Sequence, residues 1–230
     1  MVLNERQEKI VFYLKEQKRA SVKKMSEKFF VSEMTIRRDL KELEKQGYLR
    51  RYNGGALYSD QEHTLPITAR RLINSEGKKH LAEKAGKYLR DGLTIFIDSS
   101  STCTYLIPLL AEYQQITIIT NSLMTIQYAS KFHIRCILAG GVYYEPDMCT
   151  IGSITSEFLY NINADVAFFS TLGLSEDGII SDSDEGQTAV RRAIMKNCQK
   201  NIFLFDKEKI NRKYPFTLCR TDQITDFFII

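Results

Sequence analysis

Short apolar runs that alternate with helix-like segments constrain the fold of this chain most strongly. Strand-like runs occur at residues 93–97, 116–120, 134–139, 166–170 and 202–205. Helix-like segments occur at residues 76–89, 102–112, 122–131, 153–161 and 187–199. Strands that alternate with helices in this way predict an α/β domain with a mostly parallel sheet. Pro108 should kink or shorten the second of these helices.

The first 58 residues follow a different pattern, in which three short helices precede a hairpin. Apolar residues recur at helical spacing over three segments, 5–17, 22–29 and 33–46. A typical N-cap residue precedes each segment: Asn4, Ser21 and Ser32. Two β-prone stretches then flank Asn53, Gly54 and Gly55, which predicts a hairpin with a glycine turn. Three helices followed by a hairpin indicate a winged helix–turn–helix.

The basic excess of the chain is confined to these first 58 residues. They contain 14 Lys and Arg against 8 Asp and Glu, whereas the remainder contains 18 against 20. A helical wheel of the third helix places Met34, Arg38 and Lys41 opposite the apolar face. Arginine can bind guanine or phosphate, and methionine can contact a thymine methyl group. This face therefore predicts DNA binding, although a solvated basic helix face is the simpler alternative.

Residues 31–56, VSEMTIRRDLKELEKQGYLRRYNGGA, resemble the N-terminal domain of the DeoR family of bacterial transcriptional regulators. The family pattern is S-x-x-T-I-R-R-D-L, then a glycine, then R-x-H-G-G-A, and Asn53 replaces the histidine. Glu33 and Met34 occupy open positions, where we expect the choice of operator to be made. Together with the wheel, the resemblance implies contacts with double-stranded operator DNA from Ser32, Glu33, Met34, Thr35, Arg37, Arg38, Lys41, Arg50, Arg51, Gly54 and Gly55.

Polar residues follow several of the predicted strands. They are Asp98, Ser99, Ser100, Ser101 and Thr102; Thr120 and Asn121; Gly140 and Gly141; and Asp206 with Lys209. Ligands bind beyond the carboxyl ends of parallel strands, and hydroxyl groups, helix N-terminal amides, glycines and a lysine can hold a phosphate. Several of these residues are also ordinary helix caps, so capping remains the alternative at any single position. Taken together, the set predicts an anion site.

A second resemblance covers most of the remaining chain. The stretches DSSST, TNSL, AGG, TIGS, ADVAFFS, AVRRAIM and DKEKIN occur in the order of the motifs of the DeoR sensor domain. The resemblance implies the fold of sugar-phosphate isomerases and a small phosphorylated sugar as effector. Ser100 replaces the usual glycine, and Gln187 stands where a glutamate is expected. The resemblance implies an effector pocket of Ser101, Thr102, Thr120, Asn121, Gly140, Gly141, Arg191 and Lys209, to which the strand-end pattern adds Asp98, Ser99 and Ser100.

We therefore expect a winged helix–turn–helix at 1–58, a linker at 59–75 and an α/β sensing and oligomerisation domain at 76–230. The expected function is repression of a sugar-metabolism operon by a homo-oligomer, a dimer or tetramer, which a phosphorylated sugar releases from DNA. No apolar run is long enough for a membrane span and no signal segment is present, so we expect a cytoplasmic protein. The five cysteines form no CxxC pair and the histidines no HExxH motif, so neither a metal nor another cofactor is expected.

The sequence leaves two alternative functions open. A sugar-phosphate isomerase with an accessory domain would need a carboxylate base, for which Asp98, Glu185 and Asp206 are available. Each of these acids has a simple role in capping or in binding sugar hydroxyls, so we expect a sensor and no catalysis. A nucleoid protein would bind DNA weakly, without sequence preference and with a steep dependence on salt.

Overall fold

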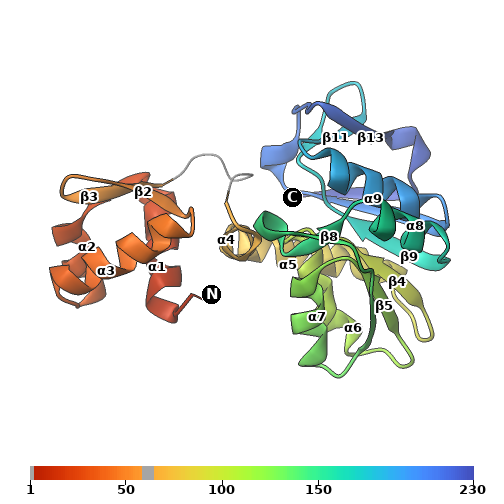
Figure 1. Cartoon of the computed structure of the whole chain (residues 1–230), viewed down its shortest axis with the longest axis horizontal. Helices are drawn as coiled ribbons and strands as arrows, with labels where there is room; N and C mark the ends of the chain where they lie inside the picture. The colour runs from red at the N-terminus through yellow and green to blue at the C-terminus, as the bar shows by residue number, and fades with distance from the viewer. Residues whose placement is uncertain (1–2, 59–64) are drawn as a thin grey trace. The chain divides into compact units, whose positions relative to one another are not determined.

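The computed structural model describes residues 3–58 and 65–230, which form two compact units (Figure 1). The first unit is Met1–Ile73 and the second is Asn74–Ile230. Part of the expected linker over 59–75 is structured, because helix α4, Ile67–Leu72, belongs to the first unit and buries Ile67 and Ala69. Residues 59–64 of that linker lie outside the described residues. In the described ranges, no helix combines the length and the hydrophobicity of a membrane span.

Three helices of the first unit begin at the capping residues that the sequence predicts. They are α1, Glu5–Gln17; α2, Val22–Phe29; and α3, Glu33–Lys45. The cap side chains accept a backbone N–H from three residues further on at 3.0–3.2 Å, and they are Asn4, Ser21 and Ser32. These bonds satisfy donors that have no partner within the helix, so they determine where each helix begins.

Helix α3 buries one face, as the helical wheel predicts. Ile36, Leu40 and Leu43 are at most 1% exposed and belong to the core of the first unit. Asp39 is also buried on this helix, and its carboxylate accepts a hydrogen bond from Arg6 Nε at 2.7 Å. Because a buried carboxylate needs such a partner, Asp39 ties α3 to α1 and does not face the solvent.

The predicted hairpin is present and extends into a three-stranded sheet. The strands are β1, Arg19–Ser21; β2, Leu49–Tyr52; and β3, Gly55–Tyr58, all antiparallel in the order β1-β3-β2. Asn53 and Gly54 form the turn, where Gly54 has a φ of 89°. A Cβ at Gly55 would overlap the carbonyl oxygen of Ala20 and the ring of Tyr52. Both glycines are therefore required by the wing itself, whatever their part in DNA binding.

Replacing Gly55 by alanine is expected to destabilise the first unit by about 1–3 kcal/mol, because the added methyl group overpacks the wing. Calorimetry of the full chain would show this as a lower transition temperature for that unit. Gly86→Ala is the matched control, since a Cβ there meets nothing within 4 Å. A wild-type transition in the Gly55 variant would contradict the close approach of β1 to β3.

Six parallel strands form the central sheet of the second unit. They are β4, Thr94–Ile97; β5, Thr117–Thr120; β6, Arg135–Leu138; β9, Ala164–Phe169; β12, Cys198–Phe205; and β14, Asp226–Ile229. Their order is β14-β12-β9-β4-β5-β6, and each neighbouring pair is parallel. The expected α/β fold with a mostly parallel sheet is confirmed.

Helices cover this sheet on both faces. The α-helices are α5, Ser75–Ala85; α6, Ile107–Leu110; α7, Leu123–Ser130; α8, Ser153–Tyr160; and α9, Glu185–Met195. The 3₁₀ turns are η2, Gly86–Tyr88; η3, Cys103–Leu106; η4, Glu145–Asp147; η5, Lys207–Lys209; and η6, Thr221–Gln223. Pro108 lies at the start of α6, so the expected helix over 102–112 is divided into η3 and a single turn, as proline predicts.

The inner strands β4, β5 and β9 are buried on both sides, which explains their continuous apolar runs, whereas the edge strands β6 and β14 are partly exposed. Along β4, Ile95 and Ile97 pack in a cluster with residues of α5 and α6, whereas Phe96 packs in another with residues of α8 and α9. Successive side chains of a strand point to opposite faces, so the sequence alternates between two cores and contains no polar face.

Two small antiparallel elements were absent from the sequence expectations. One is the hairpin of β7, Val142–Tyr144, and β8, Cys149–Ile151. The other is the sheet of β10, Gly173–Leu174; β11, Ile179–Asp182; and β13, Phe216–Arg220. These strands have two to five residues, which is too short for a period in the sequence to be recognised.

The strand order changes direction between β4 and β9, and we call the carboxyl ends of these two strands, with the loops that follow them, the crevice. The chain continues from β4 to β5 and β6 on one side, and then crosses to β9, β12 and β14 on the other. Loops that leave neighbouring strands in opposite directions open a crevice at their carboxyl ends, and ligands of open α/β sheets bind there. The polar loop 98–102 directly follows β4, so it lies at this position.

Candidate functional site

The loop after β4 is buried at the crevice. Its side chains are 0–7% exposed: Asp98, Ser99, Ser100, Ser101 and Thr102. The carboxylate of Asp98 accepts hydrogen bonds from the backbone N–H of Ser100 at 2.9 Å and of Ser170 at 3.1 Å. Ser170 directly follows β9, so Asp98 joins the loops on the two sides of the crevice.

Arg191, on α9, is held by protein groups. Its Nε and Nη1 form ion pairs with Asp98 at 3.1 Å and Asp182 at 2.8 Å, and its Nη2 donates to Gln187 Oε1 at 3.2 Å. Burial by itself lowers the pKa of Arg191, but the charges of Asp182 and Asp98 outweigh this effect and raise the pKa. The resemblance implies an effector contact for Arg191. The geometry gives this charged guanidinium a second task, which is to hold the loop after β4 in place.

Gln187 connects this network to the β7–β8 hairpin. Its Oε1 accepts a hydrogen bond from Ser99 Oγ at 3.0 Å, and its Nε2 donates to the carboxylate of Asp147 in η4. A glutamate, which the resemblance leads us to expect at this position, is ionised at neutral pH and has no N–H to donate. The amide of Gln187 therefore suits the carboxylate of Asp147.

Ser100, which replaces the glycine of the family pattern, fits the loop without strain. It is not among the residues with positive φ, and its Oγ accepts the N–H of Cys103 at 3.2 Å. That N–H begins η3, so the first donor of this turn is already used by the protein. The backbone N–H of Cys103 is therefore not free to bind an anion, contrary to the expected role of helix N-terminal amides.

Two lysine ammonium groups reach the crevice from different elements. Lys209 Nζ, from η5, donates to Ser170 Oγ at 2.7 Å, next to the loop that Asp98 holds. Lys78 Nζ, from α5, donates to Ser101 Oγ at 3.3 Å, and Lys78 is only 2% exposed. Lys78 was not among the residues predicted from the sequence. The signal was present, because Lys78 lies three residues before Leu81 on the buried stripe of α5, where lysine is rare.

The strand ends beside β4 carry further residues of the predicted set. Thr120 Oγ1 donates to the carbonyl of Ile97 at 2.7 Å, which attaches the end of β5 to that of β4. Asn121 Nδ2 donates to the carbonyl of Thr150 at 2.8 Å. Gly140 and Gly141 follow β6, one strand further along the sheet. The structure thus brings Thr120 and Asn121 to the loop 98–102 and places the two glycines further away.

Three buried polar atoms at these strand ends make no hydrogen bond within residues 3–58 and 65–230. They follow β4, β5 and β9, and they are Thr102 Oγ1, Asn121 Oδ1 and Thr171 Oγ1. Each of the three residues is at most 1% exposed. Because an unpaired buried polar atom is costly, these atoms point to a ligand that supplies their partners. Thr171 was not in the predicted set, although it follows β9 as Asn121 follows β5.

The thiols near the loop are not nucleophiles. Burial raises the pKa of Cys103 well above its ordinary value and that of Cys149 to about 11. Both thiols are therefore protonated at neutral pH, and the thiolate is the reactive form.

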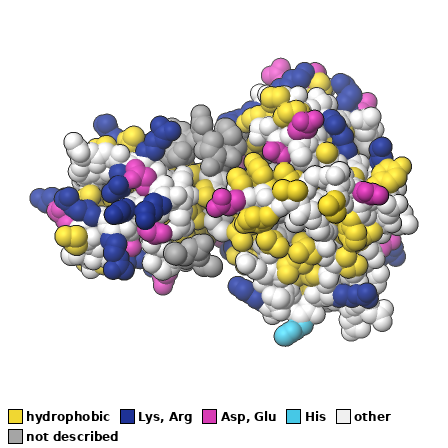
Figure 2. All heavy atoms as spheres, in the orientation of Figure 1, with side chains coloured by type: hydrophobic (Ala, Val, Ile, Leu, Met, Phe, Trp, Pro, Cys, Tyr) yellow, Lys and Arg dark blue, Asp and Glu magenta, His cyan; other side chains and the backbone are white. Residues whose placement is uncertain are grey.

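Most residues predicted to contact DNA are exposed on the first unit. Figure 2 shows Lys and Arg side chains over the face that carries α3. Arg37 and Arg51 form ion pairs with Glu33 at 3.1 Å and Glu44 at 2.5 Å. Within the predicted set, the cations without an ion pair among the described residues are Arg38, Lys41 and Arg50. The exposed members of the predicted set are Ser32, Glu33, Met34, Arg37, Arg38, Lys41, Arg50, Arg51 and Gly54, whereas Thr35 is half-buried and Gly55 is buried.

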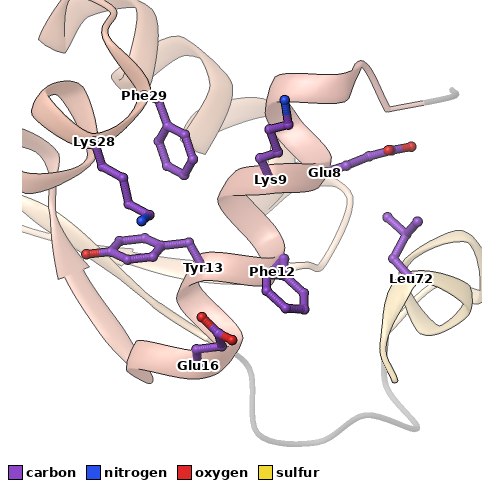
Figure 3. Close-up of a pocket in the computed structure, with 8 residues that line it drawn as sticks. All are labelled: Glu8, Lys9, Phe12, Tyr13, Glu16, Lys28, Phe29 and Leu72. Atoms are coloured by element: carbon purple, nitrogen blue, oxygen red, sulfur yellow. The ribbon is translucent and has the colours of Figure 1, made fainter. Parts of the chain in front are cut away.

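A separate pocket of about 420 Å³ lies on another part of the first unit (Figure 3). It is lined by residues of α1, α2 and α4: Glu8, Lys9, Phe12, Tyr13, Glu16, Lys28, Phe29 and Leu72. None of the residues predicted to contact DNA lines it. This pocket is therefore distinct from the DNA-binding face.

The sequence of the chain matches two family descriptions, one for each unit. Residues 6–62 match the DeoR-like helix-turn-helix domain, and residues 73–229 match the DeoR C terminal sensor domain. Among solved structures, ribose 5-phosphate isomerase A of Methanocaldococcus jannaschii is similar to part of this chain. The two align with a TM-score of 0.45 and 19% identity, over 60% of this chain and 55% of that chain.

Relatives along nearly the whole chain are transcriptional regulators. The L-fucose operon activator of Haemophilus influenzae is 30% identical, over 98% of this chain and 91% of the relative. The glycerol-3-phosphate regulon repressor of Escherichia coli is 30% identical, over 92% of this chain and 84% of the relative. The sensor match alone spans more than half of the chain. The chain therefore belongs to the DeoR family of DNA-binding transcriptional regulators.

Proposed function

We propose that this protein represses a sugar-metabolism operon and that a phosphorylated sugar releases it from its operator. The observation that carries the proposal is the crevice between β4 and β9. At the carboxyl ends of β4, β5 and β9, two lysine ammonium groups donate hydrogen bonds to Ser101 and Ser170, and three buried polar atoms have no hydrogen-bond partner among the described residues. In the same chain, the first unit presents an exposed basic recognition helix.

The chemistry of the crevice suits a ligand with both an anionic group and hydroxyl groups. The ammonium groups of Lys78 and Lys209 can form charge-assisted hydrogen bonds with a phosphate. The unpaired oxygens of Thr102, Asn121 and Thr171 can exchange hydrogen bonds with sugar hydroxyls. The names of two relatives, which refer to an L-fucose operon and a glycerol-3-phosphate regulon, support a target of this kind.

The carboxylates of the crevice support sensing over catalysis. Asp98 accepts three hydrogen bonds, from Ser100, Ser170 and Arg191, so its lone pairs are directed at the protein. Asp206 accepts hydrogen bonds from Asn74 Nδ2 and from the backbone N–H of Glu208. An isomerase needs a carboxylate that is placed to remove a proton from the sugar carbon. The protein donors that already hold Asp98 and Asp206, and the exposure of Glu185, favour sensing over this role.

Release from DNA requires two arrangements of the protein. A single winged helix–turn–helix makes a small interface, and self-association of the second unit would join two or more heads and raise their effective concentration. The effector would bind more tightly to an arrangement in which the heads no longer match the spacing of the half-sites. By linkage, the effector then weakens DNA binding by the same factor.

Thermal unfolding in the presence of sugars tests the sensing function. A panel of phosphorylated sugars is measured, each beside its unphosphorylated form. A ligand at 100 times its Kd should stabilise the second unit by about 2.7 kcal/mol. Stabilisation by one phosphorylated sugar, but not by its unphosphorylated form, is the expected result. If no member of the panel shifts the transition, the crevice does not sense a phosphorylated sugar of the panel.

Replacing Arg38 by alanine is expected to weaken binding to the operator by about 1–3 kcal/mol, because Arg38 lies exposed on the face of α3 that enters the major groove. Fluorescence anisotropy at constant salt, with operator and random duplexes, measures both affinities. Arg212→Ala, which removes an exposed arginine of the second unit, is the control. An equal loss on both duplexes would assign Arg38 to phosphate contacts.

A further inference from the structure

Phe30 has two energetically unfavourable features, the exposure of its ring and the conformation of its backbone. It is 94% exposed, the highest value among the large hydrophobic residues that the structure describes. Its backbone is also left-handed, with φ 53° and ψ 44°, at the C-cap of α2. Glycine adopts this conformation at no steric cost, whereas an aromatic residue rarely does. Backbone strain of this kind concentrates at functional sites.

Packing in the core of the first unit does not explain why a phenylalanine is present at position 30. Phe29 packs edge-on against Tyr13, with ring centroids 5.8 Å apart, and lines the pocket on α1 and α2 (Figure 3). Because Phe29 already fills this position, Phe30 contributes nothing comparable to the packing of the first unit. Its exposed ring therefore needs an explanation outside the unit.

Phe30 lies next to the start of the recognition helix. It precedes Ser32, the N-cap of α3, by two residues, and Met34 in the first turn of α3 is 75% exposed. Phe30 and Met34 are the two most exposed large hydrophobic residues in the described part of the chain. In a helix–turn–helix, the N-terminal turn of the recognition helix meets the base edges. The two apolar side chains thus flank the part of α3 that comes nearest to DNA.

The charges around Phe30 favour DNA as the partner. Exposed cations lie on the two helices that Phe30 connects: Lys23 and Lys24 on α2, and Arg37, Arg38 and Lys41 on α3. An apolar protein surface would have to desolvate these cations, whereas DNA offers phosphates to them. In the major groove the apolar group of a base pair is the C5-methyl of thymine, and phenylalanine is one of the residues that contact it.

We propose that Phe30, together with Met34, contacts thymine methyl groups of the operator at the edge of the major groove. The proposal rests on DNA binding by the first unit and adds a base-reading role for a residue outside α3. Phe30 would select thymine through apolar contact, whereas Arg38 would read bases through hydrogen bonds.

The test compares Phe30→Gly with the wild-type full-length protein on two duplexes. The first is a duplex that the wild-type protein selects from a random library, and the second replaces its thymines by uracil, which removes only the methyl groups. We expect the variant to bind the thymine duplex about tenfold more weakly than wild type, the scale of losing a large apolar contact. On the uracil duplex, the two proteins should bind equally. The variant should also melt at a higher temperature, because glycine relieves the left-handed strain.

Two further variants complete the design. Phe30→Asn introduces a residue that tolerates the left-handed backbone, and it should lose affinity for the thymine duplex as the glycine variant does. Phe132→Ala removes a ring that is 41% exposed in the second unit and should leave DNA affinity unchanged.

Equal affinities of wild type and Phe30→Gly on the thymine duplex would overturn the proposal. A loss of the same size on both duplexes would also overturn it, because the contact would then not involve the methyl groups. A loss seen only on duplexes with two half-sites would assign Phe30 to contacts between heads. Failure of the wild-type protein to select any duplex would contradict DNA binding itself, and is distinguishable from these outcomes.

Discussion

Replacing Arg191 by methionine is expected to lower the free energy of unfolding of the second unit by about 3–5 kcal/mol, because it leaves two buried carboxylates without a counter-charge. Asp98 and Asp182, which pair with this guanidinium, are 1% and 5% exposed. Calorimetry of the full chain should show a transition of the second unit lowered by more than about 6 °C.

Arg192 supplies the matched control for this experiment. It is the next residue of α9, and it is exposed. Arg192→Met should lower the stability of the second unit by about 1 kcal/mol or less, the scale of the one hydrogen bond that its Nη2 donates to the carbonyl of Thr217. A loss below about 1 kcal/mol for the Arg191 variant would show that Asp98 and Asp182 do not depend on its charge.

Replacing Lys209 by methionine should weaken effector binding by about 10- to 100-fold, the equivalent of one charge-assisted hydrogen bond of about 1.5–3 kcal/mol. The reason is the position of Lys209 Nζ, 2.7 Å from Ser170 Oγ at the crevice. Isothermal titration with the phosphorylated sugar identified by thermal unfolding measures the loss. Affinity for the operator in the absence of sugar should remain unchanged.

Lys207 allows the specific effect of Lys209 to be separated from a general change in charge. Lys207 belongs to the same 3₁₀ turn, η5, but it is exposed. Lys207→Met should therefore bind the effector as the wild type does. If the variants at 207 and 209 lose affinity equally, the lysine at 209 attracts the ligand only at long range.

The first three helices and the hairpin of the first unit could be predicted from its sequence because their signals are local, whereas β1 and α4 were not predicted. A cap residue begins each of its first three helices, and a glycine at positive φ turns its hairpin. The exposure of Phe30 could not be predicted. A phenylalanine after Phe29 reads in the sequence as one more core residue, and only the left-handed backbone directs it outwards.

β14 is not among the apolar runs predicted from the sequence, but the other five strands of the central sheet were predictable, because each is an apolar run beside helix-like segments. The β7–β8 hairpin was not, since its strands have three residues each and pair by contacts that the sequence does not reveal. As a result, the bond between Gln187 and Asp147, which attaches the hairpin to the crevice, could not be foreseen.

Part of the candidate site depends on long-range contacts, and this limits what a sequence can reveal. Asp98 and Lys209 could be placed at strand ends from the sequence alone, because the ends of parallel strands meet at one edge of the sheet. The pairing of Arg191 with Asp98 and Asp182 joins elements far apart in the chain. Lys78 lies on α5, which precedes the sheet, so its hydrogen bond with Ser101 after β4 could not be foreseen from strand ends alone.

The measurement that tests the central claim most directly is operator affinity with and without the sugar that stabilises the second unit. The full-length protein is titrated against its selected duplex at constant salt, because salt alone changes such affinities strongly. We predict that the phosphorylated sugar raises the Kd about 5- to 150-fold, the usual range of allosteric coupling, and that its unphosphorylated form leaves the Kd unchanged. An unchanged Kd with a phosphorylated sugar that demonstrably binds would contradict release from DNA as the function of the sensor.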